Sequence, residues 1–302
     1  MVILNTADPS IHFNQNSLLI LNIVLAFILF GIALELRKED FKSLLTNKRS
    51  AVVALLSHFV LLPFVTFAVA LVLQPAPGIA LGMILVGACP GGNMSNMFTH
   101  IAKGNTALAV SITSISHLLA VLFTPLNFAI YGSLYPNSES ILKEIHLSVF
   151  EVTQTAVIVV AIPLIAGMFI RYKYAELAEK LVPYARKLSL IAFAAFLVVA
   201  FYSNRSAIAN AASTILPLVV LHNATVLLSG YLFGRIMKLP VKDIRTVTFE
   251  TGIQNSGLAL IIIFSFFAGL YDMAIVAALW GVWHLVSGGA LALLWGRVPT
   301  EA

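Results

Sequence analysis

The chain has 302 residues, of which 60% are hydrophobic and only 10% are charged. An ordinary soluble domain is about one quarter charged, and a globule of this size could not bury so much apolar surface without leaving patches that aggregate. The composition therefore excludes a soluble globular protein and predicts an all-α membrane protein. The formal net charge of +5 is compatible with nucleic-acid binding, but the positions of the basic residues indicate another reason for it.

Nine segments are long and apolar enough to cross a membrane as helices, since about 20 residues span about 30 Å of hydrocarbon. In chain order, these predicted transmembrane helices cover residues 17–36, 50–73, 79–101, 105–131, 148–171, 186–203, 212–235, 244–267 and 272–295. The loops between them are short, so residues 1–302 are expected to form a single transmembrane unit. The first 16 residues lack the basic start and the cleavage site of a secretory signal, so the first helix is expected to be retained.

Lysine and arginine lie almost entirely in alternate loops. If the N-terminus is outside the cell, 16 of the 18 basic residues fall on one side of the membrane, and only Lys143 and Arg205 fall on the other. Because cytoplasmic loops carry an excess of basic residues, this distribution predicts a multi-pass protein of the inner or plasma membrane with a cytoplasmic C-terminus. The basic charge is then a cytoplasmic rim, and nucleic acid is not an expected partner.

Two of the predicted helices carry helix-breaking residues near the middle of the membrane. These are "CPGGNMSN" at 89–96 and "FETGIQNSG" at 249–257. Each follows a helix with a histidine motif, "SHFVLLP" or "LHNATVLLSG", and precedes a long helix with one histidine, His117 or His284. Interrupted helices at matching positions in two halves are typical of secondary transporters built from an inverted repeat, with the binding site at the midplane. Four helices in the first half and five in the second indicate that the first half lacks its opening helix.

The interruptions are expected to expose backbone groups that can bind ions. Unwound backbone at this depth is tolerated only against protein or a water-filled cavity, because unmade hydrogen bonds are costly in hydrocarbon. Pro90 and the glycine pair after it are expected to free carbonyl groups at the end of one half-helix and amide groups at the start of the next. The carbonyl end would favour a cation, and the amide end, where the helix dipole is positive, would favour a carboxylate.

Glu250 is the only acidic residue far from the ends of any predicted helix, and an ionisable group at that depth indicates a functional site. One interpretation is a protonated acid that neighbouring amides satisfy, and the other is a carboxylate that faces a bound cation. The oxygen atoms of Ser95, Asn96 and Thr113, together with Glu250, suit a small hard cation such as sodium and not a soft metal.

Other polar residues in the predicted helices allow weaker inferences. Asn93, Asn255 and His284 are candidates for hydrogen bonds to substrate oxygens, although such residues also join helices to one another. Glu35 and Glu151 lie near helix ends, where their side chains are expected to reach solvent.

Several alternative functions have no support in the sequence. It contains no HExxH or GxSxG motif and no paired aspartates, so an enzyme is not expected. Cys89 is the single cysteine, which excludes an intrachain disulfide and, without paired Cys/His spacing, a zinc site. A channel is disfavoured because one pair of interrupted helices with one acid resembles an occluding site more than a pore.

The motifs resemble those of the bile acid:sodium symporter family over nearly the whole chain, from residue 17 to 295. The resemblance is most specific in "GMILVGACPGGNMSNMFTHIAKGNTALAVSITS", "VVLHN", "FETGIQNSGLA" and "VWHLVSGGALA". It implies a core domain of helices roughly within 50–131 and 212–295, where the two broken helices cross, and a panel domain within 17–36 and 148–203. It also implies alternating access for bile acids or other organic anions.

The resemblance further implies two sodium sites in this chain. The first would use Ser95, Asn96, Thr113 and Glu250. The second would use Glu250, Gln254, the backbone carbonyls of Thr251 and Ile253, and a residue of the second helix. That residue is usually a glutamine, and here it is His58.

Three positions depart from the family pattern: Ala109 replaces a serine of the first site, His58 replaces the glutamine of the second, and Leu285 replaces an asparagine after the last-helix histidine. Neutral imidazole is a poor sodium ligand, and protonated imidazole would repel sodium while supplying a positive charge beside Glu250. One hypothesis is that the second sodium is weakened or replaced by a proton or a fixed charge. The other is that His58 only hydrogen-bonds Glu250 and that the first site suffices.

We therefore expect a monomeric secondary transporter of the lipid bilayer that imports an organic anion, such as a bile acid or a pantoate-like acid, by sodium-coupled alternating access. The substrate carboxylate would lie near Asn93, with Asn255 and His284 nearby. The alternative is a sodium-independent or proton-coupled carrier in which His58 replaces one sodium.

Overall fold

The computed structural model describes residues 15–36, 46–138, 149–203, 205–267 and 270–300. The regular secondary structure of this part of the chain is helical. Four stretches of it are long and apolar enough to cross a membrane, namely Lys48–Leu73, Thr106–Leu134, Ala211–Ile236 and Tyr271–Gly296. The prediction of an all-α membrane protein is therefore confirmed, whereas the count of nine crossings stays a prediction.

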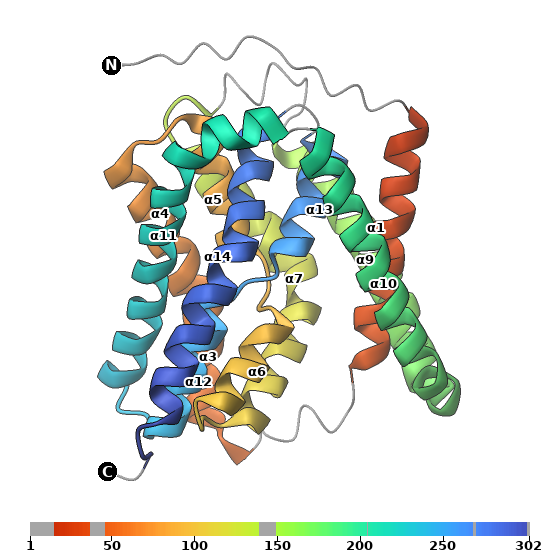
Figure 1. Cartoon of the computed structure of the whole chain (residues 1–302). Helices are drawn as coiled ribbons and strands as arrows, with labels where there is room; N and C mark the ends of the chain where they lie inside the picture. The colour runs from red at the N-terminus through yellow and green to blue at the C-terminus, as the bar shows by residue number, and fades with distance from the viewer. Residues whose placement is uncertain (1–14, 37–45, 139–148, 204, 268–269, 301–302) are drawn as a thin grey trace.

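The helices, in chain order, are α1 (Gln15–Glu35), α3 (Lys48–Leu56), the π-helical turn η2 (Ser57–Leu61), α4 (Leu62–Leu73), α5 (Pro77–Ala88), α6 (Asn93–Ile101), α7 (Thr106–Leu134), α9 (Val149–Lys173), α10 (Ala175–Ser203), α11 (Arg205–Ile236), α12 (Val241–Gly252), α13 (Ser256–Phe266) and α14 (Tyr271–Gly296). The two predicted interruptions are confirmed. The first separates α5 from α6, and the second separates α12 from α13. In Figure 1 the two connections meet near the middle of the molecule.

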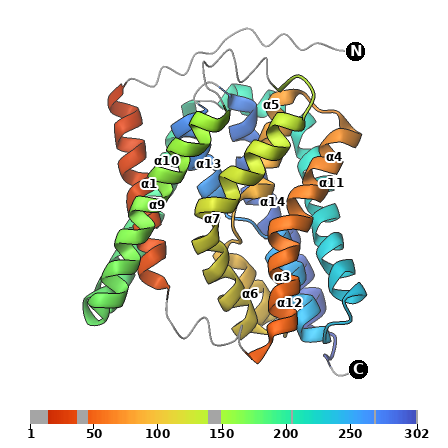
Figure 2. The ribbon, with the colours of Figure 1, turned by 180° about the vertical axis from the view of Figure 1, so that it is seen from behind.

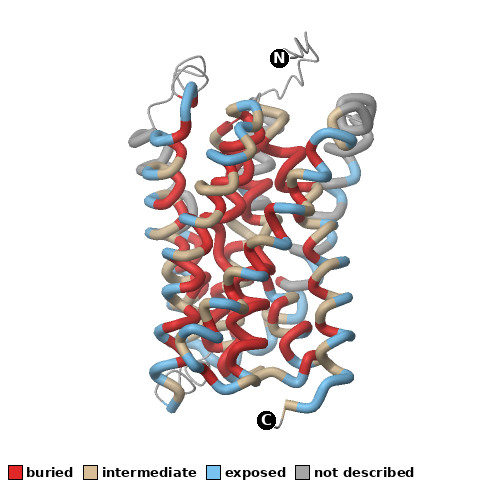
Figure 3. The backbone as a smooth tube through the Cα atoms, turned by 90° about the vertical axis from the view of Figure 1, so that its left-hand side faces the viewer, coloured by how far each residue is buried: buried red, intermediate tan, exposed pale blue. Residues whose placement is uncertain are grey.

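Helices α1, α9 and α10 form a layer on one side of the molecule, and Figures 1 and 2 show this layer from opposite directions. A small apolar cluster holds the layer together, with Leu34 of α1 buried against Ala178 and Ala185 of α10. The other helices form a larger body. Burial is concentrated along its central helices (Figure 3), where Trp280 of α14 is fully buried.

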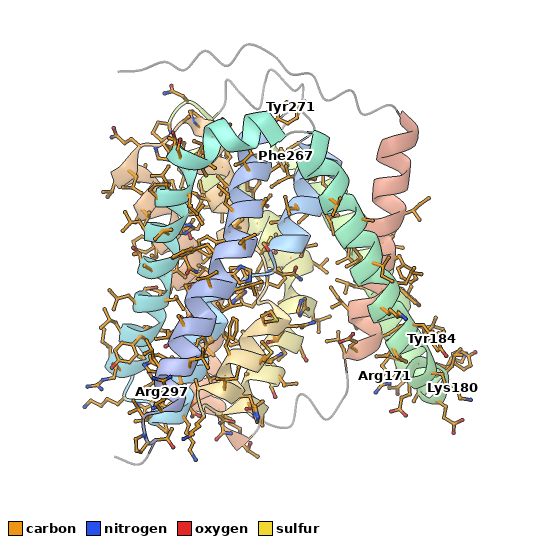
Figure 4. All side chains as sticks on the ribbon, viewed as in Figure 1. Arg171, Lys180, Tyr184, Phe267, Tyr271 and Arg297 are labelled. Carbon is orange, nitrogen blue, oxygen red and sulfur yellow. The ribbon has the colours of Figure 1, made fainter. Side chains whose placement is uncertain are left out.

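The segment from residue 171 to 187 contains the end of α9 and the start of α10. It is helical: α9 continues to Lys173, and α10 begins two residues later at Ala175. Its alanine, glutamate, leucine and lysine residues favour helix. Arg171, Lys180 and Arg297 lie at the same end of the molecule in Figure 4. Other basic residues of the predicted cytoplasmic rim, Arg37, Lys38 and Lys42, lie outside the described residues, as does Lys143, which was expected on the opposite side.

The helix that carries His58 is continuous but irregular. Helices α3 and α4 are joined by η2, a single π-helical turn, and such turns occur frequently at functional sites. Pro63 has no amide hydrogen to donate to the carbonyl of Phe59, four residues earlier. Instead, Asn127 Nδ2 of α7 donates to Phe59 O at 3.1 Å. The polar side chain of a neighbouring helix thus satisfies the backbone group that the proline leaves open.

Candidate functional site

The two interruptions hydrogen-bond to each other through their main chains. Gly92 N donates to Ile253 O at 2.9 Å, and Asn255 N donates to Pro90 O at 2.8 Å. Gly91 and Gln254 form an isolated antiparallel bridge. The expectation that both interruptions leave their backbone groups free for ligands is therefore wrong for these groups. Ile253 O, expected as a sodium ligand, already accepts one hydrogen bond and keeps its second lone pair.

Glycine is needed at this contact because the two segments approach each other so closely. A Cβ atom at Gly91 would lie 3.1 Å from Glu250 Oε2, and one at Gly92 would lie 3.0 Å from Gln254 O. Both distances are shorter than ordinary contacts between a Cβ atom and its neighbours. The glycine pair therefore lets the first interruption lie directly against Glu250 and Gln254.

A cluster of side-chain oxygens lies beside the paired interruptions, which we call the oxygen cluster. It comprises Ser95 and Asn96 of α6, Thr113 of α7 and Glu250 of α12. Ser95 Oγ donates to Glu250 Oε1 at 2.5 Å, and Thr113 Oγ1 lies 3.0 Å and 3.1 Å from the two carboxyl oxygens of Glu250. Thr113 Oγ1 also lies 3.1 Å from Asn96 Oδ1. Ser95, Thr113 and Glu250 are buried, so the structure brings the four predicted first-site residues together.

In the oxygen cluster, the hydroxyl groups of Ser95 and Thr113 face more acceptor atoms than they have hydrogens to donate. Ser95 and Thr113 carry one hydroxyl hydrogen each. Three acceptor atoms face these two hydroxyls, namely the two carboxyl oxygens of Glu250 and the amide oxygen of Asn96. Such a surplus of oxygen lone pairs suits a small hard cation. No group of three or more histidine, cysteine, aspartate or glutamate side chains that could hold a metal ion is found among the described residues.

The residues of the predicted second sodium site lie around the same turn of α12. Gln254 Nε2 donates to Thr251 O, and Gln254 Oε1 is buried without a hydrogen-bond partner. His58 Nδ1 lies 3.1 Å from Glu250 O, and His58 Nε2 is buried without a partner. Since a carbonyl oxygen can only accept, Nδ1 is the donor. The imidazole therefore binds the main chain of Glu250, whereas the carboxyl group is bound by Ser95 and Thr113.

A cavity of about 330 Å³ lies between the layer of α1, α9 and α10 and the body of the molecule. Its lining residues come from the two sides: Ile32, Leu34, Glu35, Leu36 and Val182 from the layer, and Asn93, Asn96, Val110, Thr113, Ser114 and His117 from the body. Two residues of the oxygen cluster, Asn96 and Thr113, are thus also part of the cavity wall. A cation at the cluster would directly affect the shape of that wall.

The three predicted substrate residues differ in their relation to this cavity. Asn93 is exposed at the start of α6 and lines the cavity. Asn255 caps α13, because its Oδ1 accepts from Leu258 N at 3.0 Å, and its Nδ2 lies 3.4 Å from His117 Nε2. His284 is buried on α14 and does not line the cavity. The structure therefore places Asn93 at the cavity and Asn255 one hydrogen bond behind it.

Comparison with known proteins assigns the chain to a family. The model of the sodium bile acid symporter family matches residues 22–211, which is more than half of the chain. The chain belongs to this family. Its family is one of membrane transporters, and this agrees with the absence of enzyme motifs from the sequence.

Three relatives show how far the similarity of this family member extends. The chain is 33% identical to an uncharacterized sodium-dependent transporter, YocS of Bacillus subtilis, over 92% of this chain and 83% of the relative. It is 30% identical to the probable sodium/metabolite cotransporter BASS1 of Arabidopsis thaliana over 90% of this chain. The matched region covers 66% of that relative, just under two thirds of its length. It is 28% identical to the human ileal sodium/bile acid cotransporter over 81% of this chain and 68% of the relative. All three relatives are named as sodium-dependent transporters or sodium cotransporters.

His117 and Glu35 are two of the cavity-lining residues of this symporter-family chain that sequence reasoning did not assign to the site. His117 was not assigned to the site, yet it lines the cavity and its Nδ1 donates to Thr113 O at 2.8 Å. Its position four residues after Thr113 puts both side chains on one helix face, and this spacing could have revealed it. Glu35 was expected to reach solvent but is half-buried in the cavity wall. No local signal predicts this, because it depends on how α1 lies against the body.

Proposed function

We propose that this protein is a secondary active transporter that imports an organic anion together with sodium by alternating access. The observation that supports this most is the overlap between the oxygen cluster and the cavity, since Asn96 and Thr113 belong to both. A sodium ion bound by Ser95, Asn96, Thr113 and Glu250 would fix the orientation of the cavity wall. Binding of one substrate would then favour binding of the other, which is the thermodynamic basis of coupling.

The substrate carboxylate would bind at the start of α6. Asn93 offers an amide group to the cavity there, and the positive end of the helix dipole favours an anion. Asn255 would act through His117, and His284 would act from α14 only in another conformation. Bile acids and smaller carboxylates such as pantoate-like acids are the substrate classes that we propose to test first.

The architecture that we propose has nine transmembrane helices in a single monomeric unit of residues 1–302. Two interrupted helices related by an inverted repeat would cross in a core within 50–131 and 212–295, and a panel within 17–36 and 148–203 would move against it. The paired interruptions support the repeat. The basic residues at one end (Figure 4) support a cell-membrane protein with its N-terminus outside and its C-terminus in the cytoplasm.

A second sodium ion would bind Glu250, Gln254 and the carbonyls of Thr251 and Ile253. The unpartnered Gln254 Oε1 supports this position, because a buried oxygen without a donor is one that a cation could satisfy. The alternative is a sodium-independent or proton-coupled carrier in which His58 replaces that sodium. The observation that favours this alternative is the imidazole at 3.1 Å from Glu250 O, in the place of a side-chain oxygen ligand.

Uptake of radiolabelled cholate and pantoate into proteoliposomes tests the proposed function. The wild-type protein is expected to accumulate at least one of them against its gradient when sodium, but not potassium, is supplied outside. Because Glu250→Gln removes the charge that faces the cation, it is expected to lower sodium-driven uptake at least tenfold, which corresponds to about 1.4 kcal/mol. The control is Glu176→Gln on the exposed start of α10. Equal uptake by the wild-type protein in sodium and potassium would contradict sodium coupling, and equilibration without accumulation would indicate a channel or facilitator.

A further inference from the structure

The guanidinium group of Arg245 joins the ends of three helices. Arg245 lies near the start of α12, and its side chain is buried. Its Nη1 donates to Ala102 O, at the C-cap of α6, at 2.5 Å and to Trp295 O, in the last turn of α14, at 3.1 Å. Its Nη2 donates to Val298 O at 3.2 Å and to Pro299 O at 3.4 Å. One side chain of α12 therefore holds the end of α6, the end of α14 and the segment that follows α14.

The same three helices also pack through aromatic rings next to this arginine. The ring centroids of Phe98 of α6 and Phe249 of α12 are 6.1 Å apart, and those of Phe249 and Trp295 are 5.6 Å apart. The Arg245 guanidinium carbon lies 5.8 Å from the centroid of the Trp295 ring. Burial of apolar surface is not directional, whereas the donors of a planar guanidinium group have a fixed geometry. Arg245 therefore fixes the orientation of the three helices, and not only their proximity.

The residue after Arg245 holds the start of α7. Asn105 N donates to Thr246 Oγ1 at 3.0 Å, and Thr246 Oγ1 lies 3.2 Å from Asn105 O. Asn105 is the N-cap of α7, since its Oδ1 accepts from Leu108 N at 3.1 Å. The oxygen cluster is carried by α6, α7 and α12. Two adjacent residues of α12 thus bind the ends of both other helices.

The contact at Ala102 controls the position of Ser95 in the oxygen cluster. Ser95 precedes Ala102 by seven residues, which is about 10 Å along an α-helix. Over that length, a tilt of α6 by about 6° at Ala102 would move Ser95 by about 1 Å. Ligand distances at a formed metal site keep to within about 0.2 Å, and Ser95 Oγ lies 2.5 Å from Glu250 Oε1. A small loss of alignment at Ala102 would therefore open the oxygen cluster.

We propose that Arg245 is a positioning residue for cation binding, which holds α6 and α12 in the alignment that the oxygen cluster needs to bind sodium tightly. This inference rests on the sodium site of the proposed function. Arg245 would act through the positions of Ser95 and Glu250, and it would not be a ligand of the cation. Its removal is then expected to weaken sodium binding beyond any loss of overall stability.

Sodium titrations of the melting temperature separate these two effects, because a ligand that binds only the folded protein stabilises it according to its dissociation constant. The purified full chain is titrated with sodium chloride, and potassium chloride keeps the total salt concentration constant. A merely structural role of Arg245 would lower the melting temperature equally in both salts. The dissociation constant for sodium would then be unchanged, whereas a positioning role raises it.

Two substitutions of Arg245 and one control are compared. Arg245→Gln keeps one amide group in place of the guanidinium fork, and it is expected to raise the dissociation constant for sodium about tenfold, which corresponds to about 1.4 kcal/mol. Arg245→Lys keeps the charge but not the fork, and it is expected to raise this constant about threefold. The matched control is Arg49→Gln, because Arg49 Nη2 also donates to a main-chain carbonyl, Met237 O, at 2.7 Å. Met237 directly follows α11, so the control is expected to leave the dissociation constant unchanged.

The outcomes distinguish this inference from the proposed function. An unchanged dissociation constant in every Arg245 variant that folds would overturn the role of Arg245, as would an equal rise in Arg49→Gln. If Arg245→Gln does not fold, Arg245→Lys decides. If the constant rises in the Arg245 variants but the wild-type protein accumulates neither cholate nor pantoate with sodium, the role of Arg245 stands and the proposed transport is contradicted. A wild-type protein that sodium does not stabilise would overturn both.

Discussion

Two side chains, Thr113 and His58, make the contacts with Glu250 that matter most for the function proposed for this transporter family member. The hydroxyl of Thr113 contacts both carboxyl oxygens of Glu250 and the amide oxygen of Asn96, and it lines the cavity as well. Together with Asn96, it therefore connects the candidate cation position with the candidate substrate position. The ring of His58 binds the main-chain carbonyl of Glu250 and offers no oxygen to a cation.

Replacement of His58 by glutamine tests whether the imidazole weakens a second sodium site. Because an amide oxygen is a better ligand than imidazole for a hard cation, His58→Gln is expected to lower the sodium concentration at half-maximal uptake by about three- to tenfold, equivalent to about 0.7–1.4 kcal/mol. Sodium titrations of uptake, with the Hill coefficient as a second readout, measure this effect.

The matched control for this substitution is His222→Gln. His222 is a buried histidine of α11 whose Nε2 lies 2.8 Å from Thr66 Oγ1, so it bonds a different helix from the oxygen cluster. The control is expected to leave the sodium titration unchanged. An identical half-saturating sodium concentration for the wild-type protein and His58→Gln would contradict a weakened second site, and sodium-independent uptake by the wild-type protein would favour the proton-coupled alternative.

At the level of secondary structure, the two interrupted helices form hydrogen bonds with each other's unwound main chain. Each supplies one main-chain donor and one acceptor to the other, through Gly92 N, Ile253 O, Asn255 N and Pro90 O. Unwound backbone can therefore persist inside the molecule without a ligand at these four groups, since they are paired with one another. The interruptions also bring α6 and α12 together, and the oxygen cluster is formed between these helices and α7.

A side chain at Gly91 is expected to press against the Glu250 carboxyl group. A Cβ atom there would lie 3.1 Å from Glu250 Oε2, so Gly91→Ala is expected to displace Glu250 and to destabilise the protein by about 1–3 kcal/mol. Sodium-driven uptake and the melting temperature with and without sodium measure the two effects.

Gly289→Ala in α14 is the control for this prediction, because the nearest atom to a Cβ there is 3.7 Å away, an ordinary contact. Gly289→Ala is expected to change neither the sodium-driven uptake nor the melting temperature. A Gly91→Ala variant with unchanged uptake and an unchanged response to sodium would show that the close approach of the interruptions does not matter for cation binding.

At the level of the whole molecule, the cavity lies where two groups of helices meet. The end of α1 and α10 contribute one part of its lining, and α6 and α7 contribute the other. If transport proceeds by alternating access, the two groups must move relative to each other. Contacts inside one group should then be preserved during transport, while contacts across the cavity should change.

Cysteine pairs that line the cavity test this movement. Crosslinking Ile32→Cys to Val110→Cys with a bifunctional thiol reagent joins α1 to α7 and is expected to stop uptake almost completely, with recovery after reduction. Crosslinking Ile32→Cys to Val182→Cys joins α1 to α10 within one group and is expected to leave more than about half of the uptake, since neither helix needs to move past the other. The native Cys89 is buried and is not expected to react. Full uptake after the first crosslink would contradict movement between the two groups.

Local properties of the sequence sufficed for the membrane class, the two interruptions and the residues that form the oxygen cluster, because hydropathy, helix breakers and a lone acid are properties of short segments. Only the tertiary structure decided that the interruptions pair with each other, that His58 binds the main chain of Glu250, and that Glu35 and His117 line one cavity. These outcomes depend on contacts between segments far apart in the chain: His58 and Glu250 are 192 residues apart. The packing of whole helices determines such contacts, and no short segment of the sequence specifies that packing.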